Sequence, residues 1–345
     1  MSSQQSAATQ ATPVRIFTTI QGYQQSYILK AGVEMGVFTA IAKGSHTAGE
    51  IARAIGASER GTRILCDSLT VLEFLLKQGD RYTLSADAAV FLDQRSPAYL
   101  GNALKFLLHP EQVEGFVNMA DSVRQGGTPH HASALGPEDP IWIDFARGMA
   151  PLMMPAAQAI AGLLQPHLAS QSGPARVLDI AAGHGTFGIA VAQQSPNAHI
   201  YAVDWANVLQ VATENAHARG VSDRHHTIPG SAFDVQFGNG YAAALVTNFL
   251  HHFDPPTNVT LLRKVHDALQ PGGELVILEF VPNEDRISPR VPALFSAVML
   301  NATPTGDAYT YSELRKMCEE AGFEGTRLVT LDPMPQSLVL AHKPK

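Results

Sequence analysis

The stretch between residues 175 and 192 constrains the fold of this chain more than any other part of the sequence. A short apolar run, Val177–Ile180, leads into a segment with glycine at positions 183 and 185, and small residues at helical spacing follow. This order indicates a buried strand, a tight turn and a helix whose amino end faces a ligand. Gly183 and Gly185 allow the backbone to turn sharply and to approach a bound molecule closely.

Two classes of ligand fit this turn. Gly183, Gly185 and Gly188 have the G-x-G-x-x-G spacing of dinucleotide sites, and the next apolar run ends in Asp204, where a carboxylate meets ribose hydroxyls. Asp179 lies inside the strand, before the first glycine. A carboxylate there repels a pyrophosphate but attracts the ammonium and sulfonium groups of S-adenosylmethionine. We therefore interpret the turn as a methyl-donor site. The alternatives are a nicotinamide dehydrogenase and a glycine turn without a ligand.

Composition places the chain among globular proteins. Hydrophobic residues make up 45% and charged residues 16% of the 345 residues, which is enough chain for two domains with cores of their own. A net charge of −7 with only 24 Lys and Arg argues against nucleic acid as a partner. No apolar run approaches the ~20 residues that span a bilayer. Residues 1–12 predict a disordered tail and no export leader, and Cys66 and Cys318 are expected to be buried structural thiols. We expect a soluble cytoplasmic protein.

The first part of the chain is predicted to be helical. Residues 14–42 carry apolar side chains at helical spacing that two glycines interrupt, which predicts two helices. A capping box at 47–50 opens another helix. Ser58 caps the next one, whose apolar stripe predicts that it extends to Leu76.

A short strand predicted at 81–84 completes a winged-helix arrangement, which raises the possibility of a DNA-binding regulator. The second helix of such a protein is rich in Lys and Arg. Here the helix after Ser58 has only Arg60 and Arg63 against three acidic residues. A structural or dimerising role is therefore favoured.

The helices that follow are sparsely charged. Residues 99–123 predict two helices, broken at Pro110 and apolar on more than one face, which indicates burial against a second chain. Residues 125–140 predict a loop, and residues 142–168 predict a helix kinked by prolines. We expect a tail, a helical dimerisation domain with its linking helices, and a second domain, at 1–12, 13–170 and 171–345 respectively.

The second domain alternates strands and helices, which predicts a parallel sheet covered on both faces. Strands are predicted at 176–180, 199–204, 225–228, 242–247, 274–281, 323–331 and 337–342, the last two in hairpin sequence. Helices are predicted at 258–269 and behind a capping box at Thr310. The predicted fold class is α/β, with a Rossmann-like sheet in the second domain and an all-helical, winged-helix-like first domain.

These features together resemble a known family. From about residue 17 onward the chain is similar to the S-adenosylmethionine-dependent O-methyltransferases of the plant caffeate and flavonoid type and to their bacterial relatives in natural-product and pigment pathways. The resemblance implies a methyltransferase domain, a dimerisation domain, a homodimer, S-adenosylmethionine as donor with S-adenosylhomocysteine as product, and no metal. Its motifs are the glycine turn with Asp204, Pro-Gly-Ser-Ala-Phe at 229–233, Leu-His-His-Phe-Asp at 250–254, Pro-Gly-Gly at 271–273, and Glu279.

The resemblance also implies which residues contact the donor. In the plant enzymes an Asp stands where this chain has Ser231. By position, the methionine pocket matches Asp179, Gly183 and Gly185, the ribose ligand matches Asp204, the adenine lining matches Ser231, Ala232 and Phe233, and a contact from the linking helix matches Met149.

His251 matches the family's catalytic base. It follows a buried strand at the carboxyl end, where open α/β sheets bind their ligands. A phenol, with a pKa of about 10, is mostly protonated at neutral pH, and a neutral imidazole can take its proton as the oxygen attacks the methyl group. Glu279 matches one of two glutamates that orient the base. The position of the second glutamate aligns with Ala308, beside Asp307.

The resemblance implies an apolar pocket for an aromatic acceptor, lined by Phe295, Met299, Asn301 and Thr303. The histidine pairs 130–131, 225–226 and 251–252 raise the possibility of a metal site. Adjacent residues point apart, however, and no ligand set has the spacing of a metal site, so we expect none.

The sequence therefore predicts a homodimeric enzyme that methylates a hydroxyl of a small phenolic or polyketide-like acceptor, with no nucleic-acid or membrane partner. Within the same fold the alternatives are N- or C-methylation by proximity and a relative that keeps the donor but catalyses hydroxylation or decarboxylation. A winged-helix regulator that binds S-adenosylmethionine is the alternative from another class.

Overall fold

The computed structural model describes residues 11–128 and 141–345 of the chain. The predicted tail, apart from its last two residues, and most of the loop predicted at 125–140 lie outside these ranges, as does the histidine pair 130–131. Within these ranges, no helix has the length and the apolar content that crossing a bilayer requires.

The chain divides into two compact units, Met1–Gly101 and Asn102–Lys345. The sequence predicted a division at 170–171, after the linking helices. The long helix α10 (Ile141–Ala169) packs against α11 (Thr186–Gln194) and shares one apolar core with the central strands. The linking helices are thus part of the unit that contains the large sheet.

The first unit consists of short helices and one hairpin. Residues 14–42 form three helices where two were predicted, because the chain also breaks at Gln21, before Gly22. The capping box at Thr47 and the cap at Ser58 are confirmed. The elements are α1 (Val14–Ile20), α2 (Gly22–Glu34), α3 (Val37–Ala42), α4 (Ala48–Ile55), α5 (Glu59–Val71), β1 (Leu75–Gln78), β2 (Arg81–Leu84) and α6 (Ala86–Phe91).

The prediction that the helix after Ser58 extends to Leu76 is wrong. Helix α5 ends at Val71, Glu73 adopts a left-handed conformation, and Leu75–Gln78 pairs as an antiparallel strand with Arg81–Leu84. Leu76 continues the apolar spacing of the helix, but it pairs with Thr83 in the strand and its side chain is 58% exposed. The two strands form the predicted wing.

The outer helices of the first unit carry apolar side chains that this unit does not cover. No residue of α1 is buried, and Val14, Ile16, Phe17 and Ile20 are 58–67% exposed. Tyr23 at the start of α2 is 62% exposed. By contrast, the thiol of Cys66 is buried in the first unit and that of Cys318 in the second, as predicted.

The second unit is built on a seven-stranded sheet in the order β5-β4-β3-β6-β7-β9-β8. Its first five strands are parallel, and β9 pairs antiparallel with both β7 and β8. All seven strands were predicted. They are β3 (Ala175–Ile180), β4 (Ala198–Asp204), β5 (His225–Pro229), β6 (Tyr241–Thr247), β7 (Leu269–Glu279), β8 (Glu324–Thr330) and β9 (Ser337–His342).

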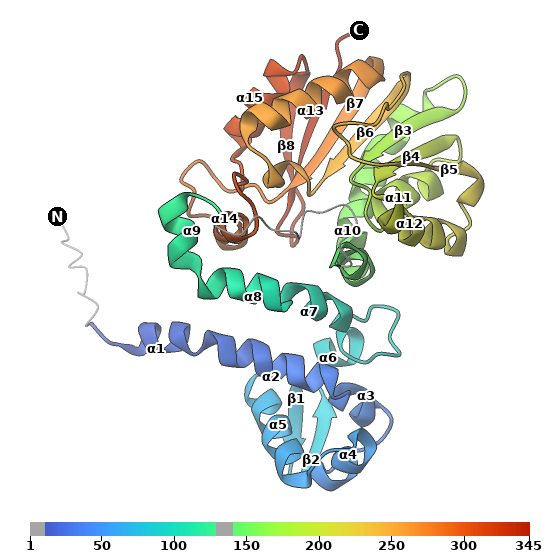
Figure 1. Ribbon diagram of the computed structural model, residues 1–345. Helices are drawn as coiled ribbons and strands as arrows, with labels where there is room; N and C mark the ends of the chain where they lie inside the picture. The colour runs from blue at the N-terminus through green and yellow to red at the C-terminus, as the bar shows by residue number, and fades with distance from the viewer. Residues whose placement is uncertain (1–10, 129–140) are drawn as a thin grey trace, which may run out of the picture. The chain divides into compact units, whose positions relative to one another are not determined.

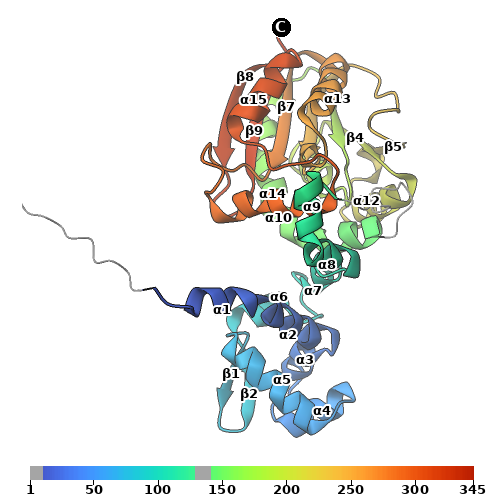
Figure 2. The same cartoon turned by 60° about the vertical axis from the view of Figure 1, so that its left-hand side comes forward.

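Helices cover both faces of this sheet (Figures 1 and 2). Helix α13 (Pro255–Ala268) and α15 (Tyr311–Glu320) close the core on one face, and α10 and α11 close the core on the other, with α12 (Ala206–Ala218) beside them. Residues 101–125 form three helices where the sequence predicted two. The remaining elements are α7 (Gly101–Leu107), α8 (Pro110–Val117), α9 (Met119–Gln125), the short helices η2 (Ser222–Arg224) and η3 (Leu250–His252), and α14 (Arg290–Ala302).

The strand order reverses between β3 and β6. From β3 the chain proceeds to β4 on one side, whereas β6 pairs with β3 on the other side. Parallel sheets of this kind bind ligands at such a switch point, beyond the carboxyl ends of the strands. The glycine turn after β3 and the segment with His251 after β6 both begin there.

Candidate active site

The turn between β3 and α11 is shaped by left-handed residues. Ala181, Gly183 and Gly185 have φ values of +52°, +55° and +72°, and Gly185 is the residue that caps α11. A Cβ on Gly188 would lie 2.5 Å from Cγ2 of Ile200 on the neighbouring strand β4, so only glycine allows α11 to pack this closely. The turn thereby presents the amino end of α11 to the carboxyl edge of the sheet.

Asp179 is fully buried at the end of β3. Its Oδ2 accepts a hydrogen bond of 3.1 Å from the backbone N–H of Gly188, whereas its Oδ1 is buried with no partner among the described residues. Burial raises the pKa of Asp179 to about 7; the Gly188 N–H opposes the shift and the charge of Asp204 adds to it. Oδ1 of Asp179 is therefore available to a hydrogen-bond donor of a bound ligand.

Asp204 joins the end of β4 to the glycine turn. Its Oδ2 accepts from the N–H of Gly183 at 2.8 Å, and its Oδ1 accepts from the N–H of Trp205 at 2.7 Å. Burial raises the pKa of Asp204, and the two N–H groups oppose that shift. The remaining lone pairs of this carboxylate are those that could accept from a vicinal pair of hydroxyls.

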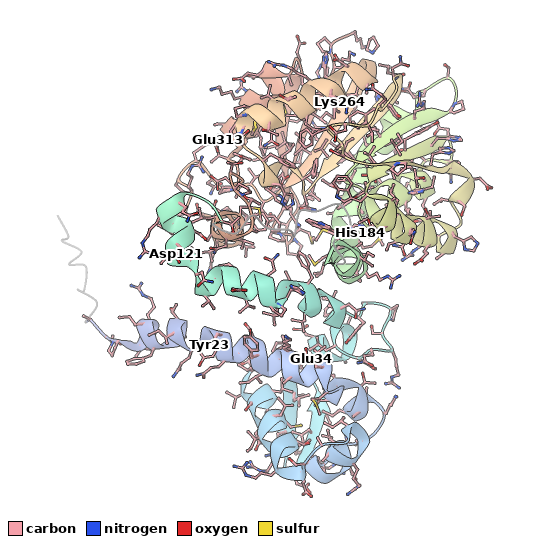
Figure 3. All side chains as sticks on the ribbon, viewed as in Figure 1. Tyr23, Glu34, Asp121, His184, Lys264 and Glu313 are labelled. Atoms are coloured by element: carbon pink, nitrogen blue, oxygen red, sulfur yellow. The ribbon has the colours of Figure 1, made fainter. Side chains whose placement is uncertain are left out.

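Sequence reasoning gave no role to His184, which lies between the two glycines. Its ring is buried, and its Nδ1 accepts from the N–H of Thr186 at 3.1 Å (Figure 3). Burial lowers the pKa of His184 to about 4, so the ring is neutral at physiological pH. Its backbone carbonyl accepts from Asn215 at 2.9 Å, which ties the turn to α12. The only sequence signal was a histidine inside the glycine motif.

The stretch 231–233 follows β5 and begins beside Asp204. The N–H of Gly230 donates to the backbone carbonyl of Asp204 at 2.8 Å, and Oγ of Ser231 accepts from the N–H of Phe233 at 3.2 Å. Ala232 is buried, and the ring of Phe233 packs edge-on against Phe253, with 5.0 Å between centroids. The two stretches matched to the ribose and to the adenine are therefore neighbours in space.

His251 and Glu279 are in direct contact, both almost fully buried. Nδ1 of His251 lies 2.5 Å from Oε2 of Glu279. Oε1 of Glu279 accepts from the backbone N–H groups of Phe249 and Leu250 at 2.9 and 2.8 Å. When a carboxylate accepts a hydrogen bond from Nδ1 of a neutral imidazole, the ring proton is on Nδ1. In the neutral form of His251 the lone pair is therefore on Nε2.

Two residues that the sequence analysis did not single out contact the turn that contains His251, which we call the base turn. Asn258 on α13 is fully buried and donates to the carbonyls of Leu250 and Phe253 at 2.9 and 3.2 Å. A Cβ on Gly306 would lie 2.1 Å from the carbonyl oxygen of His251, so the 306 backbone packs directly against the base turn. In the sequence, Asn258 is an ordinary polar residue of a helix and Gly306 an ordinary loop glycine.

The four residues matched to an acceptor pocket have different surroundings. Phe295 packs edge-on against the ring of His251, with 4.9 Å between centroids, and Phe280 stacks on Phe295 at 4.1 Å. Thr303 accepts from the N–H of Gly306 and donates to the carbonyl of the buried Met299, both at 2.8 Å. Asn301 instead donates to its own helix and lies against Gly115 of α8.

Two further positions, one beside the second family glutamate and one on the linking helix, have partners of their own. Asp307 pairs with Arg286 at 3.3 Å, and the neighbouring Ala308, at the position of the second family glutamate, is buried and carries no carboxylate. Met149 packs on the core beneath α10. One turn later, the sulfur of Met153 accepts from Asn248 at 3.6 Å, at the end of β6.

Within residues 11–128 and 141–345, no three His, Cys, Asp or Glu side chains gather closely enough to hold a metal ion. Burial holds the pKa of His252 well below its usual value.

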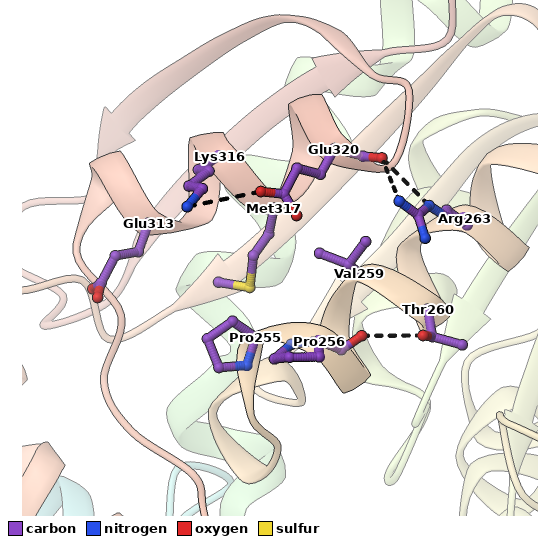
Figure 4. Close-up of a pocket in the computed structure, with 9 residues that line it drawn as sticks. All are labelled: Pro255, Pro256, Val259, Thr260, Arg263, Glu313, Lys316, Met317 and Glu320. Carbon is purple, nitrogen blue, oxygen red and sulfur yellow. Dashed lines mark hydrogen bonds and ion pairs between the residues drawn. The ribbon is translucent and has the colours of Figure 1, made fainter.

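A hollow of about 530 Å³ lies between α13 and α15, bordered by Pro255, Val259, Arg263 and Met317 (Figure 4). It contains none of the residues matched to donor or base.

Comparison with known proteins identifies the family. Residues 17–94 match the model of the O-methyltransferase dimerisation domain, and residues 156–324 match the model of the O-methyltransferase domain. This chain belongs to the O-methyltransferase family. It is an S-adenosylmethionine-dependent O-methyltransferase whose fold class and family agree with the sequence prediction.

Three relatives illustrate the breadth of the similarity. A candidate O-methyltransferase of known structure from Nostoc punctiforme is 46% identical, with a TM-score of 0.91 over 97% of this chain and 100% of that chain. The 3-hydroxy-5-methyl-1-naphthoate 3-O-methyltransferase of Streptomyces sahachiroi is 28% identical over 92% of this chain and 91% of that protein. The N,N-dimethyltransferase OxyT of Streptomyces rimosus is 27% identical over 93% and 94%.

The raised pKa of Asp179 predicts a specific pH dependence for the ligand-free O-methyltransferase. Protonated Asp179 favours the folded state, and this contribution is lost as the pH rises from the unfolded pKa of about 4 through the folded pKa of about 7. Asp179→Asn cannot ionise, so its free energy of unfolding should gain about 2 kcal/mol relative to wild type between pH 5 and pH 8. Urea unfolding at both pH values measures this difference. Identical pH slopes for the two proteins would contradict the assignment.

Proposed function

We propose that this O-methyltransferase transfers the methyl group of S-adenosylmethionine to a hydroxyl of a small aromatic acceptor, with His251 as general base. The observation that carries the proposal is the buried contact between Nδ1 of His251 and Glu279, which leaves Nε2 as a proton acceptor. His251 follows β6, which pairs with the strand that leads into the glycine turn, and Glu279 ends β7 on the other side of β6.

The residues present at the switch point fit the donor. Asp204 and the Gly183–Gly185 turn would hold the ribose and the amino-acid part, and the free Oδ1 of Asp179 would meet cationic groups. Ser231, Ala232 and Phe233 would line the adenine, and Met149 would approach the donor from α10. When bound, S-adenosylmethionine supplies a methyl group on a positively charged sulfur, which is a good leaving group.

The acceptor is proposed to lie beside the stacked rings of Phe280 and Phe295. Phe295 contacts the ring of His251, so a flat aromatic acceptor packed against it would bring a hydroxyl near the base. Met299 and Thr303 would border the same region, and Asn301 would act from the α8 side. The naphthoate named in the Streptomyces sahachiroi relative is an acceptor of this chemical class.

The protein's part in the reaction is then proton transfer and positioning. Nε2 of His251 would take the hydroxyl proton as the oxygen attacks the methyl group in line. The oxygen–hydrogen bond and the methyl carbon–sulfur bond would break as the oxygen–carbon bond forms, and S-adenosylhomocysteine would leave as a neutral thioether. Glu279 stabilises the imidazolium that results. A positioned base of this kind contributes about 10²–10⁴-fold to the rate.

A nitrogen acceptor is the second candidate. It is supported by the relative named as an N,N-dimethyltransferase and by the alanine at 308, which stands where the family has its second glutamate. A neutral amine attacks without prior deprotonation, so it depends less on His251.

Methyl transfer from labelled S-adenosylmethionine to catechols, naphthols, anthraquinones and aromatic amines tests the proposal. We expect label in a phenolic oxygen with wild type and a rate about 10²–10⁴-fold lower with His251→Ala, because the hydroxyl proton has no acceptor. His217→Ala, on the exposed side of α12, is the matched control and should keep wild-type activity. An undiminished rate with His251→Ala on a phenol would contradict the role of the base.

We also propose that the enzyme is a homodimer, with the exposed apolar residues of α1 and α2 in the interface. Phe17 is 58% exposed, and Phe17→Asp would bury a charge at such an interface and should shift the protein to a monomer in light scattering at micromolar concentration. Val71→Asp, at an 82% exposed position outside α1 and α2, is the control and should leave the dimer intact. A monomeric wild type, or a dimer that survives Phe17→Asp, would contradict this proposal.

A further inference from the structure

Lys264 is a charged side chain whose hydrogen bonds go to backbone carbonyls of a distant loop. It lies on α13 (Figure 3), and its Nζ donates to the carbonyl oxygens of Ala232 and Phe233, both at 2.9 Å. These two residues belong to the stretch that is proposed to line the adenine. The contact therefore joins a helix of the sheet's outer layer to the donor side of the site.

The surroundings of Lys264 indicate that this contact is specific. Its Nζ also lies 4.4 Å from the centroid of the Phe237 ring, which favours a cation. Burial lowers the pKa of Lys264, and Asp234 opposes that shift. A Lys that gives up part of its hydration for two carbonyls and an aromatic face fixes those carbonyls more firmly than a neutral donor would.

The other hydrogen bonds at the start of this loop hold different atoms from those that Lys264 holds. Gly230, with φ of +131°, opens the loop and donates to the carbonyl of Asp204, and Ser231 closes a turn by accepting from Asp234 and Val235. None of these bonds uses the carbonyls of Ala232 or Phe233. Ala232 is buried, and a buried carbonyl that loses its donor destabilises the conformation that holds it there.

We infer that Lys264 is a positioning residue for the methyl donor, which fixes the Ser231–Phe233 loop in the conformation that binds the adenine. The inference rests on the proposed donor site. It assigns to Lys264 no contact with the acceptor or with the transferred methyl group.

Helix α13 then serves both halves of the site through different residues. Asn258, near its start, holds the carbonyls of the base turn, and Lys264 holds those of the donor loop. Variants at these two positions should therefore have opposite effects on donor affinity and on kcat. Loss of Lys264 should weaken the donor and spare kcat, whereas loss of Asn258 should lower kcat and spare the donor.

The experiment measures the Kd of S-adenosylhomocysteine by calorimetry, and KM and kcat by methyl transfer, for Lys264→Met, Lys264→Arg and Asn258→Ala in the full chain. For Lys264→Met we expect donor Kd and KM to rise about tenfold, with kcat at saturating donor and acceptor KM within about twofold of wild type. Lys264→Arg keeps the charge and the donors and should remain within about threefold. Lys316→Met, at a side chain that is 77% exposed on α15, is the silent control.

Three results would overturn the inference. The first is an unchanged donor Kd in Lys264→Met, and the second is a parallel loss of kcat, donor affinity and acceptor KM, which would indicate general disruption. The third is a wild type that does not bind S-adenosylhomocysteine, which would overturn the proposed donor site and this inference with it.

If circular dichroism shows that Lys264→Met does not fold, Lys264→Gln replaces it. The glutamine keeps an N–H donor without the charge, so its loss of donor affinity should lie between those of Lys264→Arg and Lys264→Met.

Discussion

Both oxygens of the Glu279 carboxylate are occupied at the end of β7. One accepts from the backbone N–H groups that open the turn after β6, and the other accepts from Nδ1 of His251. A carboxylate as buried as this one is tolerated only when its lone pairs are met by donors, and here the donors are the turn and the base themselves. Without Glu279 the turn would have unpaired N–H groups, and the imidazole would lose the contact that sets its tautomer. The rest of the site is arranged around this pair.

The sheet topology brings the donor side next to that pair. Because β3 and β6 are neighbours at the point where the strand order reverses, the glycine turn and the base turn leave the same edge of the sheet. Gly188 allows α11 to pack closely on β4, and Asp204 fixes the N–H of Gly183, so the turn has a defined shape before any ligand binds. Helix α13 adds the third connection, since Asn258 and Lys264 hold the base turn and the donor loop from one rigid element.

Local patterns account for what the sequence could predict. Apolar runs bounded by glycine and proline located all seven strands, and S/T-x-x-E spacing located both capping boxes. The motifs around 183 and 251 located residues that the structure brings to one edge of the sheet. The helix end at Val71 was missed because Leu76 keeps the apolar spacing of a helix while it pairs in a strand.

The supporting residues of the site could not be predicted from local sequence patterns, because their roles depend on tertiary contacts. Asn258, Lys264 and Gly306 act through contacts with segments that are distant in sequence or separated by a turn, and each has an ordinary role in its own element. Asp307 illustrates the converse case. It is adjacent in sequence to the position of the second family glutamate, but its side chain pairs with Arg286. A one-residue offset therefore changes the direction in which the carboxylate points.

The most direct test of this account is the kinetics of Glu279→Gln. The amide keeps an oxygen for the N–H groups of the turn, but its NH₂ cannot accept from Nδ1 of His251, so the turn should persist while the base loses its tautomer. We predict that kcat on a phenolic acceptor falls about a hundredfold or more, while the Kd of S-adenosylhomocysteine stays within about twofold of wild type. A Glu279→Gln enzyme with wild-type kcat would contradict the central claim that this carboxylate orients the base.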